Sequence, residues 1–180
     1  MSMLYEALIR NEPELFQKQL QKQHCGLIAA TYTDVLELMP DVYPILCDLP
    51  SGVLFSDYLF DIKVHMLMPG QWPCVPNWHC DFVPRDDTGK LLPHLIQPGE
   101  PPMFMWVSGD PYTEFMDGPI LPRQWRRFTR RDKHRGVKAK RHIWRLFLRA
   151  APREFFPERV LKLPKLRRHA QVYIEPDFTW

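Results

Sequence analysis

The segment Trp78-His79-Cys80-Asp81 contains the most informative residues of this 180-residue chain. If the segment is extended, side chains repeat every second residue, so His79 and Asp81 leave the same face and can hold one ion together. A second imidazole, from His134, completes a set of three ligands. Two histidines and one carboxylate on one side of a metal, with the other positions open, suit non-haem Fe(II) and oxygen chemistry.

Each of these residues also has an ordinary structural explanation. A surface histidine and a turn-forming aspartate are common, and His134 lies within a basic, hydrophilic run. Trp78 beside the motif favours partial burial, however, and a buried His-Asp pair needs a partner or an ion. His142 competes with His134 as the distal ligand, because it too precedes an arginine on a strand-like run. We prefer His134, since a short turn after it would place it on a strand next to the one with Arg145.

Length and cysteine usage indicate one domain, 1–180, large enough to bury a core without disulfide support. Within it we expect a helical layer over 1–50, a core over 51–150 and a C-terminal extension over 151–180. The four cysteines form no CxxC pair, which argues against a zinc ribbon or a disulfide framework. Neither a secretory leader nor a membrane-spanning apolar run is recognisable, so we expect a cytoplasmic protein with no membrane partner.

The charge distribution is strongly asymmetric along the chain. Residues 1–121 carry 6 basic and 16 acidic side chains, a net charge of −10, whereas residues 122–180 carry 18 and 5, a net charge of +13. The segment 123–141, from Arg123 to Arg141, holds 10 of these basic residues with Trp125 and Phe128 between them. This pattern is typical of a solvated face that balances the acidic region. It is also the footprint expected for nucleic acid or another anionic partner.

The secondary-structure signals change near residue 51. A cap, a proline and a carboxylate at 11–14 predict a helix over about 12–23, and Thr33-Asp34 predicts a short helix ending before Pro40. Short apolar or alternating runs broken by Pro and Gly follow. We expect strands over 58–68, 78–83, 103–108, 125–130, 142–150 and 171–174. The long segment 84–102 is expected to be a loop beside the site.

The strand expected over 142–150 has two distinct faces. Arg145 and Arg149 share one face with Phe147, and Trp144 and Leu146 lie on the other. One interpretation buries the Trp/Leu face and exposes the arginines. The preferred one covers both faces, with helices on one side and a cavity lined by the arginines on the other. Short strands after a helical layer predict an α+β, mainly β fold: a double-stranded β-helix, that is a cupin-like jelly roll, with the N-terminal helices packed outside.

The order of these features resembles the Fe(II)/2-oxoglutarate-dependent oxygenase superfamily, with a distal spacing similar to that of the phytanoyl-CoA hydroxylase-like branch. The resemblance covers about residues 58–150 and rests on His79-x-Asp81, then His134, then Arg145 eleven positions later. It implies that His79, Asp81 and His134 bind iron and that Arg145 pairs with the distal carboxylate of 2-oxoglutarate. An arginine fork suits that role through two parallel hydrogen bonds. Arg149, on the same face, is a second candidate cosubstrate contact.

The leading hypothesis is therefore an enzyme, a non-haem Fe(II)/2-oxoglutarate-dependent dioxygenase, expected to hydroxylate an unknown substrate that is anionic or a nucleic acid. In that class the cofactors Fe(II) and 2-oxoglutarate react with O2, and the protein positions the substrate. One alternative is a non-catalytic jelly-roll module that binds nucleic acid or protein through its basic C-terminal third. Another is a cupin-like metalloenzyme that needs no 2-oxoglutarate. The iron site alone does not identify the substrate.

Overall fold

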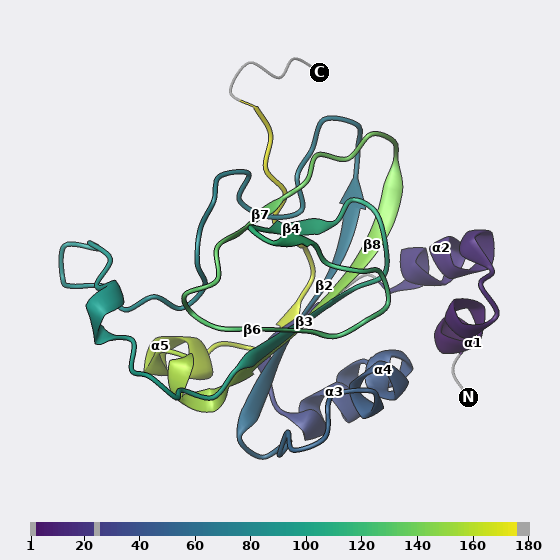
Figure 1. The fold of residues 1–180 in the computed structure, drawn as a ribbon. Coiled ribbons are helices and arrows are strands. Elements are labelled where there is room, and N and C mark those ends of the chain that lie inside the picture. Colours follow the sequence, from purple (N-terminus) through teal and green to yellow (C-terminus); the bar gives the residue numbers. More distant parts are fainter. Residues whose placement is uncertain (1–2, 24–25, 176–180) are drawn as a thin grey trace.

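The fold is described from a computed structural model that covers residues 3–23 and 26–175 (Figure 1). It is an α+β structure, mainly antiparallel β-sheet, with a few short helices. The α-helices are α1 (Met3–Ile9), α2 (Pro13–Lys22), α3 (Tyr32–Leu38), α4 (Tyr43–Cys47) and α5 (Glu158–Leu161). Single 3-10 turns are η1 (Pro40–Val42), η2 (Pro93–Leu95) and η3 (Arg153–Phe155). The strands are β1 (Gly26–Ala30), β2 (Tyr58–Leu67), β3 (Met103–Val107), β4 (Thr113–Phe115), β5 (Gly118–Pro119), β6 (Arg126–Phe128), β7 (His134–Gly136), β8 (Ile143–Pro152) and β9 (Leu166–Arg167).

Nine strands form two antiparallel sheets among the described residues. The large sheet has the order β6-β3-β8-β2-β1-β9, and the small sheet has the order β5-β4-β7. Strands β2 and β8 form the centre of the large sheet and pair over ten residues each, from Tyr58 opposite Pro152 to Leu67 opposite Ile143. Their length and apolar, β-branched and aromatic content make them the frame on which the other elements assemble.

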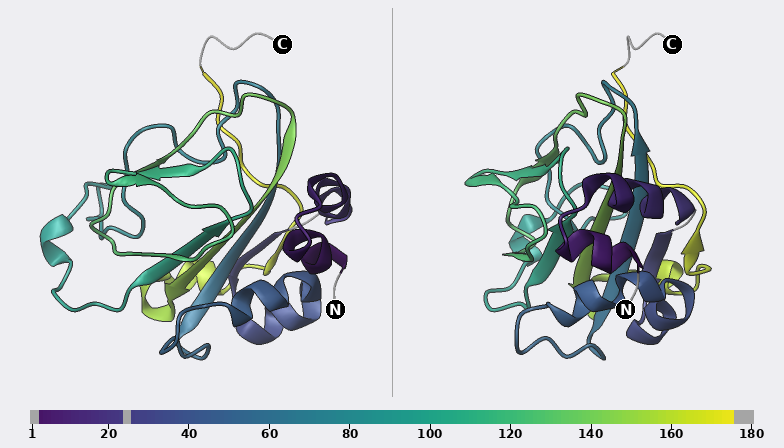
Figure 2. Two further views of the ribbon diagram at one scale, coloured as in Figure 1. Left: turned by 45° about the vertical axis from the view of Figure 1, so that its right-hand side comes forward. Right: turned by 90° about the vertical axis from the view of Figure 1, so that its right-hand side faces the viewer.

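The two faces of the large sheet are covered differently. Helices α1 to α4 lie against one face, and the small sheet and its connecting loops lie over the other (Figure 2). Leu146 and Leu148 of β8 belong to the hydrophobic core under the helices, together with Phe60 and Ile62 of β2. Phe147 belongs to a second core that faces the small sheet. Successive side chains of a strand point to opposite faces, so β8 contributes to both cores.

Local signals explain the helices of the outer layer. Pro13 opens α2 within its first turn, as predicted for the helix over 12–23. Helix α3 begins one residue earlier than expected, because Thr31 caps it: the Thr31 hydroxyl accepts a hydrogen bond from the Asp34 amide, and the Asp34 carboxylate accepts one from the Thr31 amide. The predicted packing of helices outside the sheet is therefore present.

Several predicted elements are wrong. The first 50 residues are not purely helical, because β1 joins the large sheet between α2 and α3. Segments 78–83 and 171–174 are not strands; each makes one isolated bridge, His79 with His134 and Tyr173 with Trp72. In the first segment Phe82 has a φ of 54°, which ends the extended conformation.

The predicted pairing of the strand with His134 and the strand with Arg145 is also wrong. Strand β7 pairs with β4, and β8 pairs with β2 and β3, so the two residues lie in different sheets. The turn after Gly136 crosses from one sheet to the other instead of making a hairpin.

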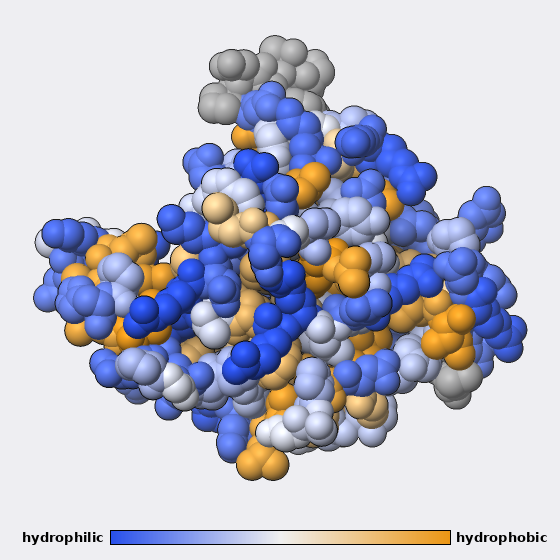
Figure 3. All heavy atoms as spheres, in the orientation of Figure 1, coloured by the Kyte–Doolittle hydropathy of each residue, from blue (hydrophilic) through white to orange (hydrophobic). Residues whose placement is uncertain are grey.

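The predicted loop over 84–102 contains η2 and carries exposed Leu91 and Leu95. Figure 3 shows hydrophobic side chains on the surface of the region that holds this loop.

Candidate metal centre

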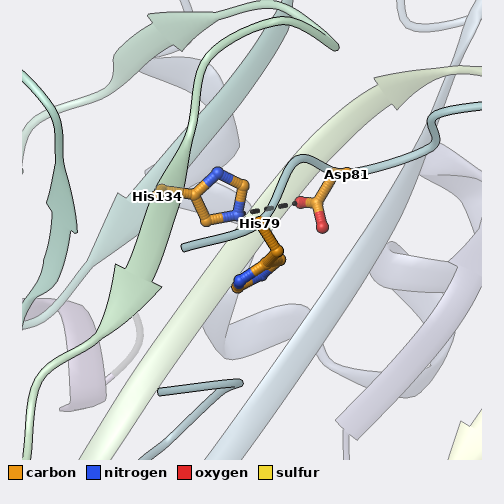
Figure 4. A group of neighbouring side chains, drawn as sticks. All are labelled: His79, Asp81 and His134. Atoms are coloured by element: carbon orange, nitrogen blue, oxygen red, sulfur yellow. Dashed lines mark ion pairs between the residues drawn. The ribbon is translucent and has the colours of Figure 1, made fainter. Parts of the chain in front are cut away.

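One antiparallel bridge brings His79, Asp81 and His134 together. The His79 amide donates to the His134 carbonyl at 3.0 Å, and the His134 amide donates to the His79 carbonyl at 2.9 Å. This adds segment 78–81 to the free edge of β7, and the three side chains point toward one another over the large sheet (Figure 4). One ligand atom from each residue lies within 4.8 Å of the others, a separation that can hold a metal ion.

The backbone fixes which nitrogen each histidine presents. Nδ1 of His79 lies 2.9 Å from the carbonyl oxygen of Asn77, and Nδ1 of His134 lies 3.2 Å from that of Asp132. A carbonyl oxygen can only accept, so each ring donates from Nδ1 and turns Nε2 to the site. Nε2 of His134 faces Asp81 Oδ2 at 3.5 Å, so a protonated His134 forms an ion pair with Asp81 and a neutral one offers its lone pair to a metal (Figure 4). Burial also lowers the pKa of His79, which favours the neutral, ligating form.

Asp81 is held ionised by a buried guanidinium. Burial by itself would raise the pKa of Asp81, but Arg149, whose Nη1 lies 2.5 Å from Asp81 Oδ2, and His134 outweigh it and keep the pKa well below its ordinary value. Arg149 also pairs with Asp61 of β2, whose side chain is 4% exposed. The two carboxylates outweigh desolvation in turn and raise the pKa of Arg149. The charges of Asp61, Asp81 and Arg149 thus compensate one another.

Arg145 and Arg149 lie on the buried face of β8, as the preferred interpretation of the strand predicted, but their surroundings differ. The Arg145 guanidinium donates from Nε to the Pro111 carbonyl at 2.8 Å and from Nη2 to Thr113 Oγ1 at 3.1 Å. Among the described residues no carboxylate pairs with it, although Arg145 is only 1% exposed. Desolvation lowers its pKa to about 10, so the group remains cationic at neutral pH.

A chamber of about 180 Å³ lies between the two sheets at the metal ligands. We call it the inner chamber, and its walls include His79, Asp81, His134, Lys63, Thr113 and Arg149. Arg145 lies directly behind this wall, in contact with Thr113. The inner chamber has room for a small organic acid beside a metal, and most of its wall residues are polar or charged, with Val75, Met105 and Phe147 as the apolar part.

The structure separates the two candidate distal histidines. His142 is exposed and lies at a surface hollow beside α2, apart from the cluster that holds His134. The basic segment 123–141 is used largely within the fold. Four of its ten basic side chains pair with acids of other segments: Arg126 with Asp117, Arg130 with Glu100, Arg135 with Glu114 and Lys138 with Glu175. Glu100, Glu114 and Asp117 belong to the acidic region 1–121, so these three pairs balance part of its charge, as the solvated-face interpretation holds.

Sequence reasoning missed part of the site. Asp61, which links Arg149 to the β1 backbone through the Ala29 amide, was not anticipated, nor were Thr113 and the wall residues Gln171 and Tyr173. A signal was available for β2. Asp61, Lys63 and His65 place polar groups at every second position of an otherwise apolar run, which marks a face that lines a polar cavity.

No protein-family model, no curated protein and no solved structure matches the chain, so its own geometry is the basis for interpreting the site. Among the helices of residues 3–23 and 26–175, none has the length and apolar character needed to cross a bilayer.

Proposed function

We propose that the protein is an Fe(II)/2-oxoglutarate-dependent oxygenase, a hydroxylase, built on a jelly-roll fold. The observation that carries the proposal is the convergence of His79, Asp81 and His134 at the inner chamber, where one potential ligand atom of each lies within 4.8 Å of the others. Two imidazoles and one carboxylate are the donor set of non-haem Fe(II) oxygenases. The two antiparallel sheets around the chamber, with helices outside, support the jelly-roll assignment.

The residues of the chain have separate tasks in this proposal. When bound, iron and 2-oxoglutarate supply the oxidising chemistry, which side chains cannot provide. His79 and His134 offer Nε2 because their Nδ1 atoms are engaged by backbone carbonyls. Arg149 keeps Asp81 anionic and fixes its direction. The phenylalanines around His134 keep water from the site, since the rings of Phe115 and Phe128 lie 5.1 and 5.6 Å from its ring.

Arg145 is proposed to bind the distal carboxylate of 2-oxoglutarate. It is a buried cation without an acidic partner among the described residues, and two of its donors are occupied by neutral oxygens. The remaining N–H groups can meet a carboxylate that reaches past Thr113. Such a charge-assisted contact is shorter and stronger than a neutral hydrogen bond.

The test is the charge-transfer absorption band of protein loaded anaerobically with Fe(II) and 2-oxoglutarate. The band is expected with the wild type and is expected to vanish in His79→Ala and Asp81→Ala. His142→Ala is the matched control, because it also removes an imidazole but lies outside the cluster, and it should leave the band unchanged. A wild type that binds iron without ever showing the band would contradict the proposal.

Arg145 separates this function from a metalloenzyme that needs no 2-oxoglutarate. Arg145→Glu reverses the charge at the proposed carboxylate contact, so it should raise the 2-oxoglutarate concentration that half-saturates the band, while iron content stays at the wild-type level. Turnover that continues in Arg145→Ala without 2-oxoglutarate would favour the cosubstrate-independent enzyme.

A further inference from the structure

A second chamber joins the first under the C-terminal segment. This outer chamber, of about 340 Å³, lies between the sheet and residues 167–171, and its walls include Leu27, Lys63, Arg149, Arg167, His169 and Gln171. Lys63, Arg149 and Gln171 line both chambers, so the two spaces are neighbours with these side chains between them. The outer chamber therefore leads from the edge of the large sheet to the side chains that border the candidate metal site, and a route is completed where they move apart.

The route is electropositive. Among the described residues of this wall, the one carboxylate is Asp61, which pairs with Arg149, whose charge Asp81 also compensates. Lys63 and Arg167 remain as two cations without a direct acidic partner in the wall. A cleft lined by one sign of charge attracts and concentrates ligands of the opposite sign. The route thus favours a small anion over a neutral or cationic molecule.

Lys63 is the one cation at the junction that has no partner. It makes no hydrogen bond or ion pair with the described residues, and its Nζ lies 5.5 Å from the centre of the Phe147 ring. The side chain is largely buried on β2, and desolvation, followed by repulsion from Arg149, lowers its pKa. Burying a cation without a direct ion pair is costly, and the two carboxylates that attract Lys63 from a distance, Asp61 and Asp81, are already paired with Arg149. An anion bound to Lys63 would therefore remove part of a cost that the fold otherwise bears.

Resting on the oxygenase function proposed above, we propose that the substrate is a small organic anion that enters through the outer chamber and is held at the metal by Lys63. A carboxylate or a phosphate monoester has the required charge and size. The ammonium group binds the charged end, and the rest of the molecule extends into the inner chamber beside the metal ligands.

From its position, Lys63 is better placed to contact the substrate than the cosubstrate. Lys63 of β2 is paired with Phe147 of β8. On the inward face of β8, Phe147 lies between Arg145 and Arg149. The outer chamber contacts the Arg149 side of this row and does not reach His65 or Arg145. Two anions can therefore bind at one metal from different sides, one near Arg145 and one near Lys63.

The experiment measures binding of small anions to metal-loaded protein under anaerobic conditions, by calorimetry with and without 2-oxoglutarate. The probes are phenylacetate, malate and glycerol phosphate, with phenylacetamide as the neutral match of the first. At least one anion should bind the wild type, and Lys63→Met should weaken it by about tenfold or more, since hydrogen bonds to charged groups contribute about 1.5 to 3 kcal/mol. Lys63→Arg should retain part of the affinity. Lys90→Met, which removes an exposed loop lysine, should retain all of it.

In the binding experiment, the inference is overturned if no probe anion binds the wild type or if Lys63→Met binds every probe as well as the wild type does. A titration of the Lys63→Met charge-transfer band with 2-oxoglutarate shows whether Lys63 binds the substrate or the cosubstrate. An unchanged half-saturation supports the substrate role, and a parallel loss of 2-oxoglutarate affinity assigns Lys63 to the cosubstrate and overturns it. If the wild type shows no band but binds an anion in a Lys63-dependent way, the anion site stands and the oxygenase proposal fails.

A measurement on the wild type tests the proposal without a variant that could misfold. Lys63 is expected to react with an acylating reagent at pH 8 in the free protein and to be protected by the probe anion, as read by peptide mass spectrometry. Reactivity that the anion leaves unchanged contradicts the proposal.

Discussion

Arg145 and Arg149, at the two ends of the inward face of β8, are the same kind of side chain with different partners. Arg149 pairs with Asp61 and Asp81, so its charge is compensated within the protein. Arg145, two inward-facing positions away, is buried more completely, yet its partners are a carbonyl and a hydroxyl. A compensated cation organises its neighbours, whereas an uncompensated one is available to a ligand. We therefore assign Arg149 to the assembly of the site and Arg145 to binding.

The largest expected effect comes from removing the compensated arginine. Arg149→Met should lower the free energy of unfolding by about 3 to 5 kcal/mol, because losing one partner of a buried ion pair leaves a charge uncompensated. Asp61 and Asp81 are both left without this counter-ion, and Asp61 is the more deeply buried of the two. Urea-induced equilibrium unfolding measures the change. The double variant Asp61→Asn/Arg149→Met should regain part of the loss, and a loss below about 1 kcal/mol would place the pair with ordinary surface contacts.

The pH dependence of stability examines the other end, where His65 lies opposite Arg145. The Pro73 carbonyl approaches the ring, but neither ring nitrogen makes a well-formed hydrogen bond, and burial, followed by repulsion from Arg145 and Lys63, holds the pKa of His65 well below its ordinary 6.5. Below pH 6.5 the unfolded chain binds a proton that the folded chain does not. Stability is complete above that pH and falls below it, by up to about 1.4 kcal/mol per pH unit.

Unfolding of the metal-free protein at pH 7 and pH 5 measures this loss, which we expect to reach about 2 kcal/mol. His65→Met should show a shallower decline, since it removes the group that must stay neutral. Equal declines in both proteins would mean that other groups control the acid sensitivity.

Removing the uncompensated arginine should change stability less. Arg145→Met loses hydrogen bonds to neutral acceptors and leaves no buried carboxylate behind, so the free energy of unfolding should change by less than about 1.5 kcal/mol. The variant should nevertheless lose 2-oxoglutarate affinity. The comparison between the two arginines fails if Arg145→Met is as unstable as Arg149→Met under the same urea titration.

An exposed ion pair should show the smallest loss of unfolding free energy in this comparison. The side chains of Arg135 and Glu114 are 41% and 34% exposed, and their Nε–Oε2 distance is 2.8 Å. Arg135→Gln should cost about 0.5 kcal/mol or less at physiological salt, because exposed ion pairs are screened. A cost near that of Arg149→Met would show that burial does not control the strength of these pairs.

The long central strands could be predicted because their sequences are strongly patterned. Strands β2 and β8 are ten residues long, and their polar residues fall on one face. Strand β1 could not be recognised, since Gly26–Ala30 is a short run of small and aliphatic residues without alternation. A strand at His134 was expected, but its partner β4 could not be recognised, because this pairing depends on contacts between segments far apart in the chain.

The cluster of His79, Asp81 and His134 was predicted more fully than the elements that position it. These residue types indicated a metal site, although the extended segment expected around the first two is only a bridge. The partners of the arginines could not be predicted in the same way. Whether a buried guanidinium meets a carboxylate depends on the register of β2 against β8, and a shift of one residue would turn Asp61 to the other face.

The C-terminal segment has a consequence for how the protein is made. Residues 167–171 line the outer chamber, and Gln171 and Tyr173 also line the inner one. A ribosome adds these residues about 30 positions after His134, so the ligands exist in the nascent chain before the wall that shields them. A released chain that ends before residue 167 would keep the three candidate ligands but lack this wall, so a metal held by it would be open to solvent.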